Sequence, residues 1–195
     1  MVARASKPAT WEDLLALEAQ HPDHAFELIN GVIVEKAQPT LSHGETQLAV
    51  AAWGRQHFRK GPPGGGRGWV FGTEVDVELK PGRVVRPDVA GWRCERLPRR
   101  KDRPLKVVPD WTCEVMSEGP SDRRRDLVTK VQLYAEAAVP FYWTIDPEAR
   151  SLTVYRWTDS GYLVALTGAA DDVVRPPPFE AVDVKVADLL ADEDE

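Results

Sequence analysis

Residues 111–145 read WTCEVMSEGPSDRRRDLVTKVQLYAEAAVPFYWTI and decide the fold class. We predict a strand over Trp111–Met116 and another over Phe141–Ile145, because short apolar and aromatic runs are typical of buried strands. Ser121 is the expected N-cap of a long helix that runs to Ala138. Its apolar positions follow the 3.6-residue period of a helix packed on one face: Leu127, Val131, Tyr134, Ala135 and Ala138. A strand, a helix and a strand in this order indicate a mixed α/β sheet.

Upstream of this stretch, the sequence predicts two helices and a hairpin. Thr10 and Asp13 resemble a capping box that opens a helix to about Ala19, and Ser42 with Glu45 resembles a second one. Asn30-Gly31 separates Phe26–Ile29 from Val32–Glu35, and an Asn-Gly pair between apolar runs is typical of a tight hairpin turn.

The remaining elements are mostly strands. Alternation and turn residues predict them over Trp69–Phe71, Val75–Leu79, Arg83–Trp92, Leu152–Trp157 and Tyr162–Leu166, with a short strand and a helical turn near Leu189. Residues 61–68 are rich in glycine and proline and predict a loop. We therefore expect an α/β (α+β) fold, in which helices flank a mixed sheet and extra β-hairpins are attached.

Length and composition favour a single domain. The 195 residues are 43% hydrophobic, which suits one domain with its core at about residues 10–170 and a solvated acidic tail at 191–195. The sequence shows neither a secretory signal nor a membrane-spanning apolar run, so we expect a cytoplasmic protein. Cys94 and Cys113 lack the spacing of a zinc site or a disulfide framework, and we expect reduced thiols.

The charge is unevenly distributed. The net charge of −6 argues against a protein that simply coats nucleic acid. Basic clusters at Arg93–Lys106 and Arg123–Arg125 nevertheless allow local binding of a polyanion. The seven tryptophans are spread over the predicted elements and are interpreted as core residues.

Two acids stand inside short apolar strands, where a charge is costly. Asp88 lies in VVRPDVA (84–90) and Glu114 in WTCEVM (111–116). If both strands bring their carboxylates to one point, a hard cation such as Mg²⁺ between them would relieve the repulsion. Each acid taken alone also fits an ordinary exposed residue or, for Asp88, a local pair with Arg86.

Three further residues have two readings each. Lys130 adjoins the apolar stripe of its helix and either reaches toward Glu114 or forms an exposed pair with Asp126 at spacing i,i+4. Glu27 alternates with Phe26 and Leu28, and this pattern alone favours the solvent side. His43 is either a surface residue of a first helical turn or a contact to a phosphate or to a metal-bound water.

Taken in order, several of these segments resemble the Uma-type restriction endonuclease family, a branch of the PD-(D/E)XK nuclease superfamily. The resemblance covers roughly Thr10 to Leu166 and rests on FELING (26–31), RPDV (86–89), CEVMS (113–117), Arg125-Asp126 with Lys130 and Tyr134, and VPFYWTIDP (139–147).

This resemblance implies a restriction endonuclease-like core and a site for Mg²⁺, with Mn²⁺ as an alternative. Asp88 would be the acid of the PD motif, Glu114 the (D/E), and these two would bind the metal. Glu27 would be an additional catalytic acid. Met116 stands where the superfamily has its lysine, so Lys130 would supply that cation.

The implied activity is metal-dependent hydrolysis of phosphodiester bonds in DNA, without an organic cofactor. The expected DNA contacts are the loop with Arg99, Arg100, Lys101 and Arg103, and the helix start at Arg123–Arg125. Because restriction-type nucleases often act as dimers, a homodimer is a further expectation, formed through exposed aromatic hairpins near Tyr155 and Tyr162. Met116 and the overall acidity leave a second reading open: a non-catalytic binding or regulatory module with the same fold.

Overall fold

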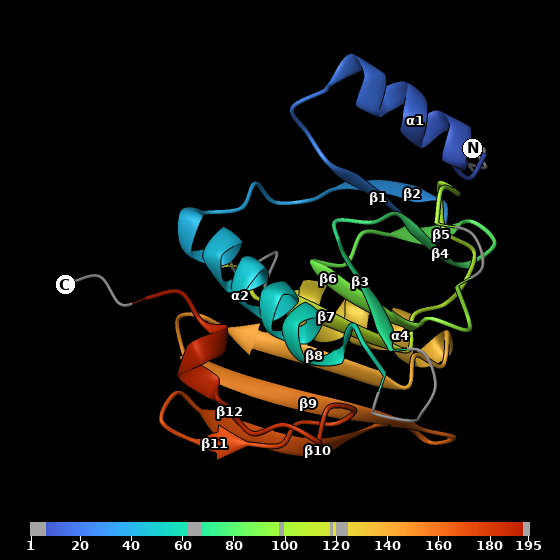
Figure 1. Cartoon of the computed structure of the whole chain (residues 1–195). Coiled ribbons are helices and arrows are strands. Elements are labelled where there is room, and N and C mark those ends of the chain that lie inside the picture. The colour runs from blue at the N-terminus through green and yellow to red at the C-terminus, as the bar shows by residue number, and fades with distance from the viewer. Residues whose placement is uncertain (1–6, 62–67, 98–99, 118, 120–124, 193–195) are drawn as a thin grey trace.

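A computed structural model describes residues 7–61, 68–97, 100–117, 119 and 125–192 (Figure 1). Its central feature is a six-stranded sheet. In spatial order the strands are β10 (Gly161–Ala169), β9 (Ser151–Thr158), β8 (Phe141–Asp146), β7 (Trp111–Val115), β6 (Val89–Arg93) and β3 (Trp69–Thr73). Only β7 and β8 pair in parallel, and the other neighbours in this sheet are antiparallel.

The parallel pair explains the long connection between β7 and β8. Parallel neighbours need a crossover, whereas antiparallel ones can be joined by a tight turn. The described part of this crossover is a π-helical turn, η1 (Arg125–Lys130), followed by α4 (Val131–Glu136). A helix is thus present where Ser121–Ala138 was predicted, but it is π-helical at first and ends at Glu136. Ser121, the predicted N-cap, lies outside the described residues.

A second sheet of four strands has the order β2 (Val32–Glu35), β1 (Phe26–Ile29), β5 (Arg83–Val85) and β4 (Val77–Lys80). The predicted hairpin is confirmed, since Phe26 pairs with Glu35 and both turn residues have positive φ, 54° at Asn30 and 77° at Gly31. A third sheet consists of β11 (Val173–Val174) and β12 (Val184–Lys185).

The single strand predicted over Arg83–Trp92 is wrong. The chain leaves the four-stranded sheet after Val85 and enters the six-stranded sheet at Val89. Pro87 lies in this break, where a residue without an N–H group costs no ladder hydrogen bond. The break matters for the site because it contains Asp88.

Two helices begin with side-chain caps. At α1 (Trp11–Gln20) the predicted capping box of Thr10 and Asp13 is present. At α2 (Leu41–Phe58) the cap is Thr40, whose hydroxyl accepts the N–H of His43. The prediction of Ser42 as the cap is therefore wrong, because the helix begins before it. A short 3₁₀ helix, η2 (Val186–Leu189), confirms the predicted helical turn near Leu189.

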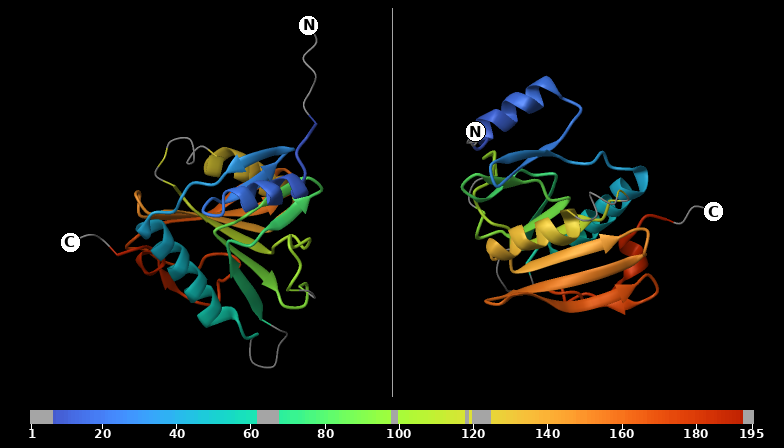
Figure 2. Two further views of the ribbon diagram at one scale, coloured as in Figure 1. Left: turned by 90° about the horizontal axis from the view of Figure 1, so that it is seen from above. Right: turned by 180° about the vertical axis from the view of Figure 1, so that it is seen from behind.

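Helices α2 and α4 cover opposite faces of the six-stranded sheet (Figure 2). Because side chains alternate along a strand, Trp111 and Cys113 of β7 pack in the core beneath α2. Tyr142 of β8 and Leu133 of α4 belong to the core on the other face, which also includes residues of β4 and β5. The mixed α/β prediction is confirmed at this level. Several tryptophans are core residues as expected: Trp69, Trp92, Trp111 and Trp143 are buried.

Two surface expectations are corrected. Tyr155 and Tyr162 are half-buried, and the Tyr162 hydroxyl donates to the Val139 carbonyl at 2.8 Å. The exposed apolar residues of the β9–β10 hairpin are instead Leu163 and Val164. Ala191, the first residue of the expected solvated tail, is buried and its N–H donates to the Thr46 hydroxyl, while residues 193–195 lie outside the described part of the chain.

Both cysteines are free, as predicted. Within the part of the chain that the structure describes, no helix has the length and apolarity that a bilayer crossing requires.

Candidate active site

Asp88 is fixed in the break between β5 and β6. Its Oδ2 accepts the main-chain N–H of Val115 at 2.7 Å, and its Oδ1 accepts the ammonium group of Lys36 at 2.7 Å. His43, in the first turn of α2, places Nε2 3.4 Å from the same Oδ1. Asp88 thus lies beside the end of β7, where Glu114 is the preceding residue.

Glu114 faces α4 because its neighbours in β7, Cys113 and Val115, face the opposite side of the sheet. Its Oε2 accepts the Lys130 ammonium at 2.7 Å, and its Oε1 accepts the Tyr134 hydroxyl at 2.5 Å. Lys130 is 1% exposed and is the last residue of η1. The expectation that Lys130 is exposed is therefore wrong, and Lys130 points inward toward Glu114. The side chain of Asp126, its alternative partner, lies outside the described residues. π-Helical turns are frequent at functional sites.

Glu27 is fully buried, so the solvent-side reading of its strand pattern is wrong. The whole of β1 is buried because it lies inside the four-stranded sheet, between β2 and β5. Glu27 Oε1 accepts the Arg86 N–H at 2.8 Å and lies 3.7 Å from Lys130 Nζ. Its Oε2 is buried and has no hydrogen-bond partner among the described residues.

Three residues of this region had no signal in the sequence: Lys36, Glu74 and Gln47. The Lys36 ammonium donates to both carboxylate oxygens of Glu74 at 2.7 Å. Gln47 of α2 donates to Glu74 Oε1 at 3.2 Å and to the Asp88 carbonyl at 2.8 Å. Lys36 directly follows an exposed strand end, where lysine is usually a surface residue. Glu74 has a φ of 53°, which is uncommon for a residue other than glycine and costs free energy.

The alternative for Asp88, a local pair with Arg86, is not formed. The Arg86 guanidinium forms ion pairs with Asp76 and Glu18 instead. The main-chain carbonyl of Arg86 accepts a hydrogen bond from the Lys36 ammonium at 3.1 Å. Arg86 therefore supports the site through its main chain, while its side chain joins an ion-pair network near α1.

Electrostatics keep Asp88 ionised and Lys36 charged. Burial alone raises the pKa of Asp88, but the Lys36 ammonium, the hydrogen bond from His43 and the Lys130 charge outweigh it and bring the pKa far below its usual range. Burial alone lowers the pKa of Lys36, and the Asp88 and Glu74 carboxylates reverse this, so that its pKa lies above the usual value. Burial raises the pKa of Glu74.

Two neighbouring groups remain protonated. Burial, followed by the charges of Glu114 and Glu27, raises the pKa of Tyr134 well above its usual value, so that its hydroxyl stays a donor to Glu114. Burial, with the charges of Asp88 and Glu114, likewise raises the pKa of Cys113. Cys113 is therefore a packed thiol and unsuited to act as a nucleophile.

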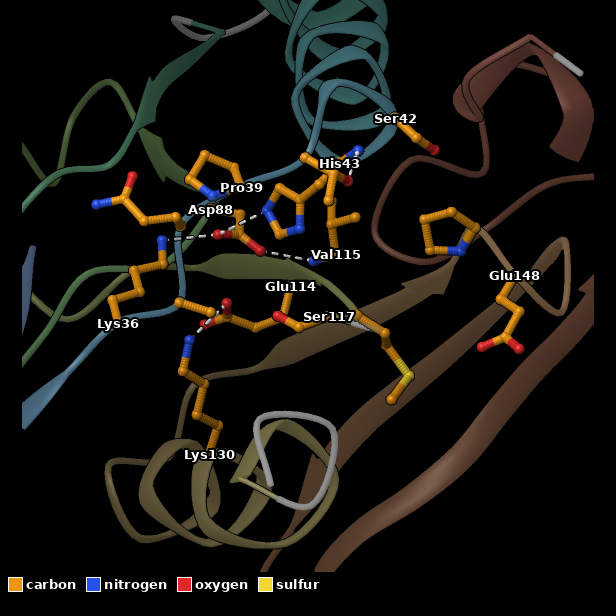
Figure 3. A pocket seen from close by; sticks show the side chains of 15 residues that line it. Lys36, Pro39, Ser42, His43, Asp88, Glu114, Val115, Ser117, Lys130 and Glu148 are labelled. Carbon is orange, nitrogen blue, oxygen red and sulfur yellow. Dashed lines mark hydrogen bonds and ion pairs between the residues drawn. The ribbon is translucent and has the colours of Figure 1, made fainter. Parts of the chain in front are cut away.

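One cavity of about 420 Å³ brings the central residues together (Figure 3). Its walls include three predicted site residues, Asp88, Glu114 and Lys130, together with His43 and Lys36. Glu27 is not among the lining residues, and its Oε1 lies 3.7 Å from Lys130 Nζ. Met116, at the position where the superfamily has its lysine, also lines the cavity.

Two described members of the basic cluster at 93–106 lie away from the cavity or are engaged in ion pairs. Arg103 is paired with Asp76 and Glu18, and Arg100 lines a hollow beside Arg59 and Lys60 at the far end of α2. Of the other expected DNA contacts, Arg99, Arg123 and Arg124 lie outside the described residues, as does the side chain of Arg125.

The donor set fits a hard divalent cation. Counted over the part of the chain that the structure describes, four ionised carboxylates face two ammonium groups, an excess of two negative charges: Glu27, Glu74, Asp88 and Glu114 against Lys36 and Lys130. The Oε2 of Glu27 is in addition a buried oxygen without a hydrogen-bond partner among the described residues. Among the described residues no three His, Cys, Asp or Glu side chains form a metal cage. Asp88 and Glu114 at an open cavity suit Mg²⁺, which takes one or two carboxylates and keeps several waters.

Buried carboxylates paired with lysines beside a cavity could hold a divalent ion, and metal-dependent hydrolases are one class of protein that uses such a site. The comparisons narrow this class. The chain belongs to the Uma2 family, described as "Putative restriction endonuclease", whose model matches residues 11–187.

The fold has a solved relative. A crystal structure of "a putative nuclease belonging to DUF820 from Anabaena variabilis" superposes with a TM-score of 0.71 at 22% sequence identity, covering 93% of this chain and 97% of that one. At 22% identity the match shows similarity of fold alone. The comparison with curated proteins returned no match.

Proposed function

We propose that this protein is a metal-dependent endonuclease with a restriction endonuclease-like core that hydrolyses phosphodiester bonds of DNA. The observation that carries the proposal is the convergence of Asp88, Glu114 and Lys130 on one cavity. Membership of a family described as "Putative restriction endonuclease" supports the substrate class. Because the net charge is −6, we expect binding to depend on local contacts and to weaken steeply with salt.

Each residue has a role that its contacts support. Asp88 and Glu114 would hold Mg²⁺ or Mn²⁺, which supplies an activated water and stabilises phosphoryl charge when bound. The Val115 N–H and the Tyr134 hydroxyl fix the orientation of the two carboxylates. Lys130 offsets the charge of Glu114. It takes the role of the superfamily's lysine, whose position in this chain is occupied by Met116. Glu27, behind it, positions the Lys130 ammonium.

His43 borders the cavity at the N-terminal turn of α2. The N-terminus of a helix favours negative charge, so this side of the cavity is suited to a phosphate group. His43 is therefore a candidate contact to the phosphate, in addition to its contact with Asp88.

A nicking assay on supercoiled plasmid tests the proposal. We expect wild type to convert plasmid to open circles with Mg²⁺ or Mn²⁺ and to be inactive with EDTA. Asp88→Asn and Glu114→Gln should each lose at least about 100-fold in rate, because each removes a carboxylate from the metal site. Glu180→Gln, at an exposed position, is the matched control. Equal inactivity of wild type and Asp88→Asn with both metals would refute the nuclease.

The alternative is a non-catalytic binding or regulatory module. It is favoured by Met116, and by the fact that each oxygen of Asp88 and Glu114 already accepts a donor within the chain. Calorimetric titration with MnCl₂ separates the two. Tight Mn²⁺ binding that is lost in Glu114→Gln counts against the module.

A further inference from the structure

Lys36 has unusual surroundings for a lysine. Its ammonium group lies within 3.1 Å of four oxygen atoms: both carboxylate oxygens of Glu74, Oδ1 of Asp88 and the carbonyl oxygen of Arg86. An ammonium group has only three N–H donors, so the protein already saturates it. The side chain is 9% exposed. In this arrangement Lys36 has no donor left to offer a substrate.

The residues that supply these oxygens also have contacts that do not involve Lys36. Asp88 is fixed through Oδ2 by the Val115 N–H, and Glu74 Oε1 accepts a hydrogen bond from Gln47. The Glu74 main-chain N–H is shared between the carbonyls of Pro87 and Asp88, at 3.2 and 3.4 Å. The oxygen cage is therefore built into the chain, and the lysine occupies its centre.

The chemistry of the cage is that of a cation site. Carboxylate and carbonyl oxygens are the ligands of hard divalent ions, which bind them at about 2.0–2.6 Å depending on the ion. Three of the oxygens lie 2.7 Å from Lys36 Nζ, so a small contraction would bring them within reach of a metal in its place. The cage also shares Asp88 with the cavity where the metal site is proposed (Figure 3).

Lys130 is different. Its ammonium is bonded to Glu114 at 2.7 Å and lies 3.7 Å from Glu27. Of these two lysines, Lys36 is the one whose ammonium contacts an oxygen of Asp88, at 2.7 Å, and it therefore competes for this oxygen with a metal bound at the cavity. His43 Nε2 lies farther from the same oxygen, at 3.4 Å.

We propose that the Lys36 ammonium fills a second cation position beside Asp88, so that the site takes one divalent ion where an uncharged small residue at position 36 would admit two. The inference rests on the proposed function for the first ion only. Lys36 is a positioning residue here, because it acts through Asp88 and Glu74. Glu74 retains the ammonium when a metal draws on Asp88, since two of the four oxygens belong to it.

Calorimetry with MnCl₂ on the full chain tests this. We expect one Mn²⁺ per chain for wild type and two for Lys36→Ala, because the truncated side chain vacates the cage. Lys36→Met should bind one, since its side chain still extends into the cage without a charge. The double variant Lys36→Ala/Glu74→Gln should return to one, because the gained ion depends on Glu74. Circular dichroism checks that each variant is folded.

The outcomes separate the two proposals. If Lys36→Ala binds Mn²⁺ with the stoichiometry and affinity of wild type, Lys36 is an ordinary structural ion pair and the inference is overturned. If wild type binds none while Lys36→Ala binds one through Glu74, the proposed metal-dependent function fails but the cation position stands. If Lys36→Ala is unfolded, refolding with MnCl₂ that the double variant lacks supports the inference. Failure to refold at any Mn²⁺ concentration overturns it.

Discussion

Replacing Lys130 by methionine probes the most deeply buried ion pair of the site. Methionine keeps the length and most of the volume of lysine but removes its charge and its donors. Lys130 is 1% exposed, and its Nζ lies 2.7 Å from Glu114 and 3.7 Å from Glu27. The variant therefore leaves two buried carboxylates without their ammonium group, while the packing around η1 changes little.

The expected cost follows from this burial. Removing one partner of a buried ion pair typically costs about 3–5 kcal/mol, whereas an exposed pair contributes about 0–1 kcal/mol. Tyr134 still donates to Glu114 Oε1, which keeps one of its oxygens satisfied. We therefore expect a loss of about 3 kcal/mol, at the lower end of the buried range. For a chain of this size that corresponds to roughly 6–12 °C in Tm.

Urea unfolding followed by circular dichroism measures the loss, in EDTA so that metal does not contribute. The double variant Lys130→Met/Glu114→Gln is the matched control. Because it also neutralises the carboxylate, it should recover more than half of the loss. Glu27 is expected to account for the remainder.

A loss below about 1 kcal/mol would refute the reasoning, since it would give Lys130 the energetics of an exposed pair. A double variant no more stable than Lys130→Met would do the same, because the cost would then not arise from the unpaired Glu114 carboxylate. The inward reading of Lys130 would have to be abandoned in either case.

Three further predictions concern the framework. Thr40→Ala should lower the free energy of unfolding by about 1 kcal/mol and Ser42→Ala by much less, because Thr40 caps α2; equal losses in urea unfolding would argue against this cap. Gly54→Ala should lower the free energy of unfolding by about 1–3 kcal/mol, since the new Cβ would lie 2.9 Å from Phe71 Cε1. In the same helix, a Cβ at Gly44 meets nothing within 4 Å, so Gly44→Ala should raise the free energy of unfolding by up to about 1 kcal/mol. Thermal melts in which Gly54→Ala is the more stable variant would contradict the packing. Hydrogen bonds from the Thr10 N–H and, to a smaller extent, from the Thr10 hydroxyl lower the pKa of Asp13. The contribution of the capping box to stability is therefore present above pH 3.8 and is lost as the pH falls through the lowered pKa. An NMR titration of Asp13 with a midpoint at or above pH 3.8 would show that the box is not formed.

Much of the fold was predictable because its signals are local. The Asn30-Gly31 turn and the capping box at Thr10 depend on residues a few positions apart, and both are present as predicted. The strand break at Arg86–Asp88 was not predicted, because the apolar pattern of residues 83–92 continues through it. What separates β5 from β6 is the choice of partner strands, β4 and β1 on one side and β3 and β7 on the other, and this choice is a property of the whole chain.

The site was predictable only where a motif marks it. Asp88, Glu114 and Lys130 come from segments that resemble the family, and they meet at one cavity. Lys36 and Asp88 are 52 positions apart, and Lys36 and Glu74 are 38 apart, so no local spacing relates them. The burial of Glu27 could also not be predicted from its alternation with Phe26 and Leu28. An internal strand of a covered sheet is buried on both faces, and alternation then no longer distinguishes inside from outside.

The two sheets meet at the residues that form the oxygen cage. The chain passes from the six-stranded to the four-stranded sheet at Glu74, after β3, and returns through Arg86–Asp88, before β6. Both passages present oxygens to Lys36, which itself ends the β1–β2 hairpin and leads into α2. The Lys36 ammonium therefore joins both passages, so its contacts stabilise the junction of the sheets as well as the charge of Asp88. Removing the Lys36 ammonium, or replacing it by Mn²⁺, should then change the local stability of β4 and β5. We accordingly expect amide exchange in these strands to quicken in Lys36→Ala without metal and to slow again when Mn²⁺ is added, whereas β8 and β9, which lie away from the junction, should respond to neither.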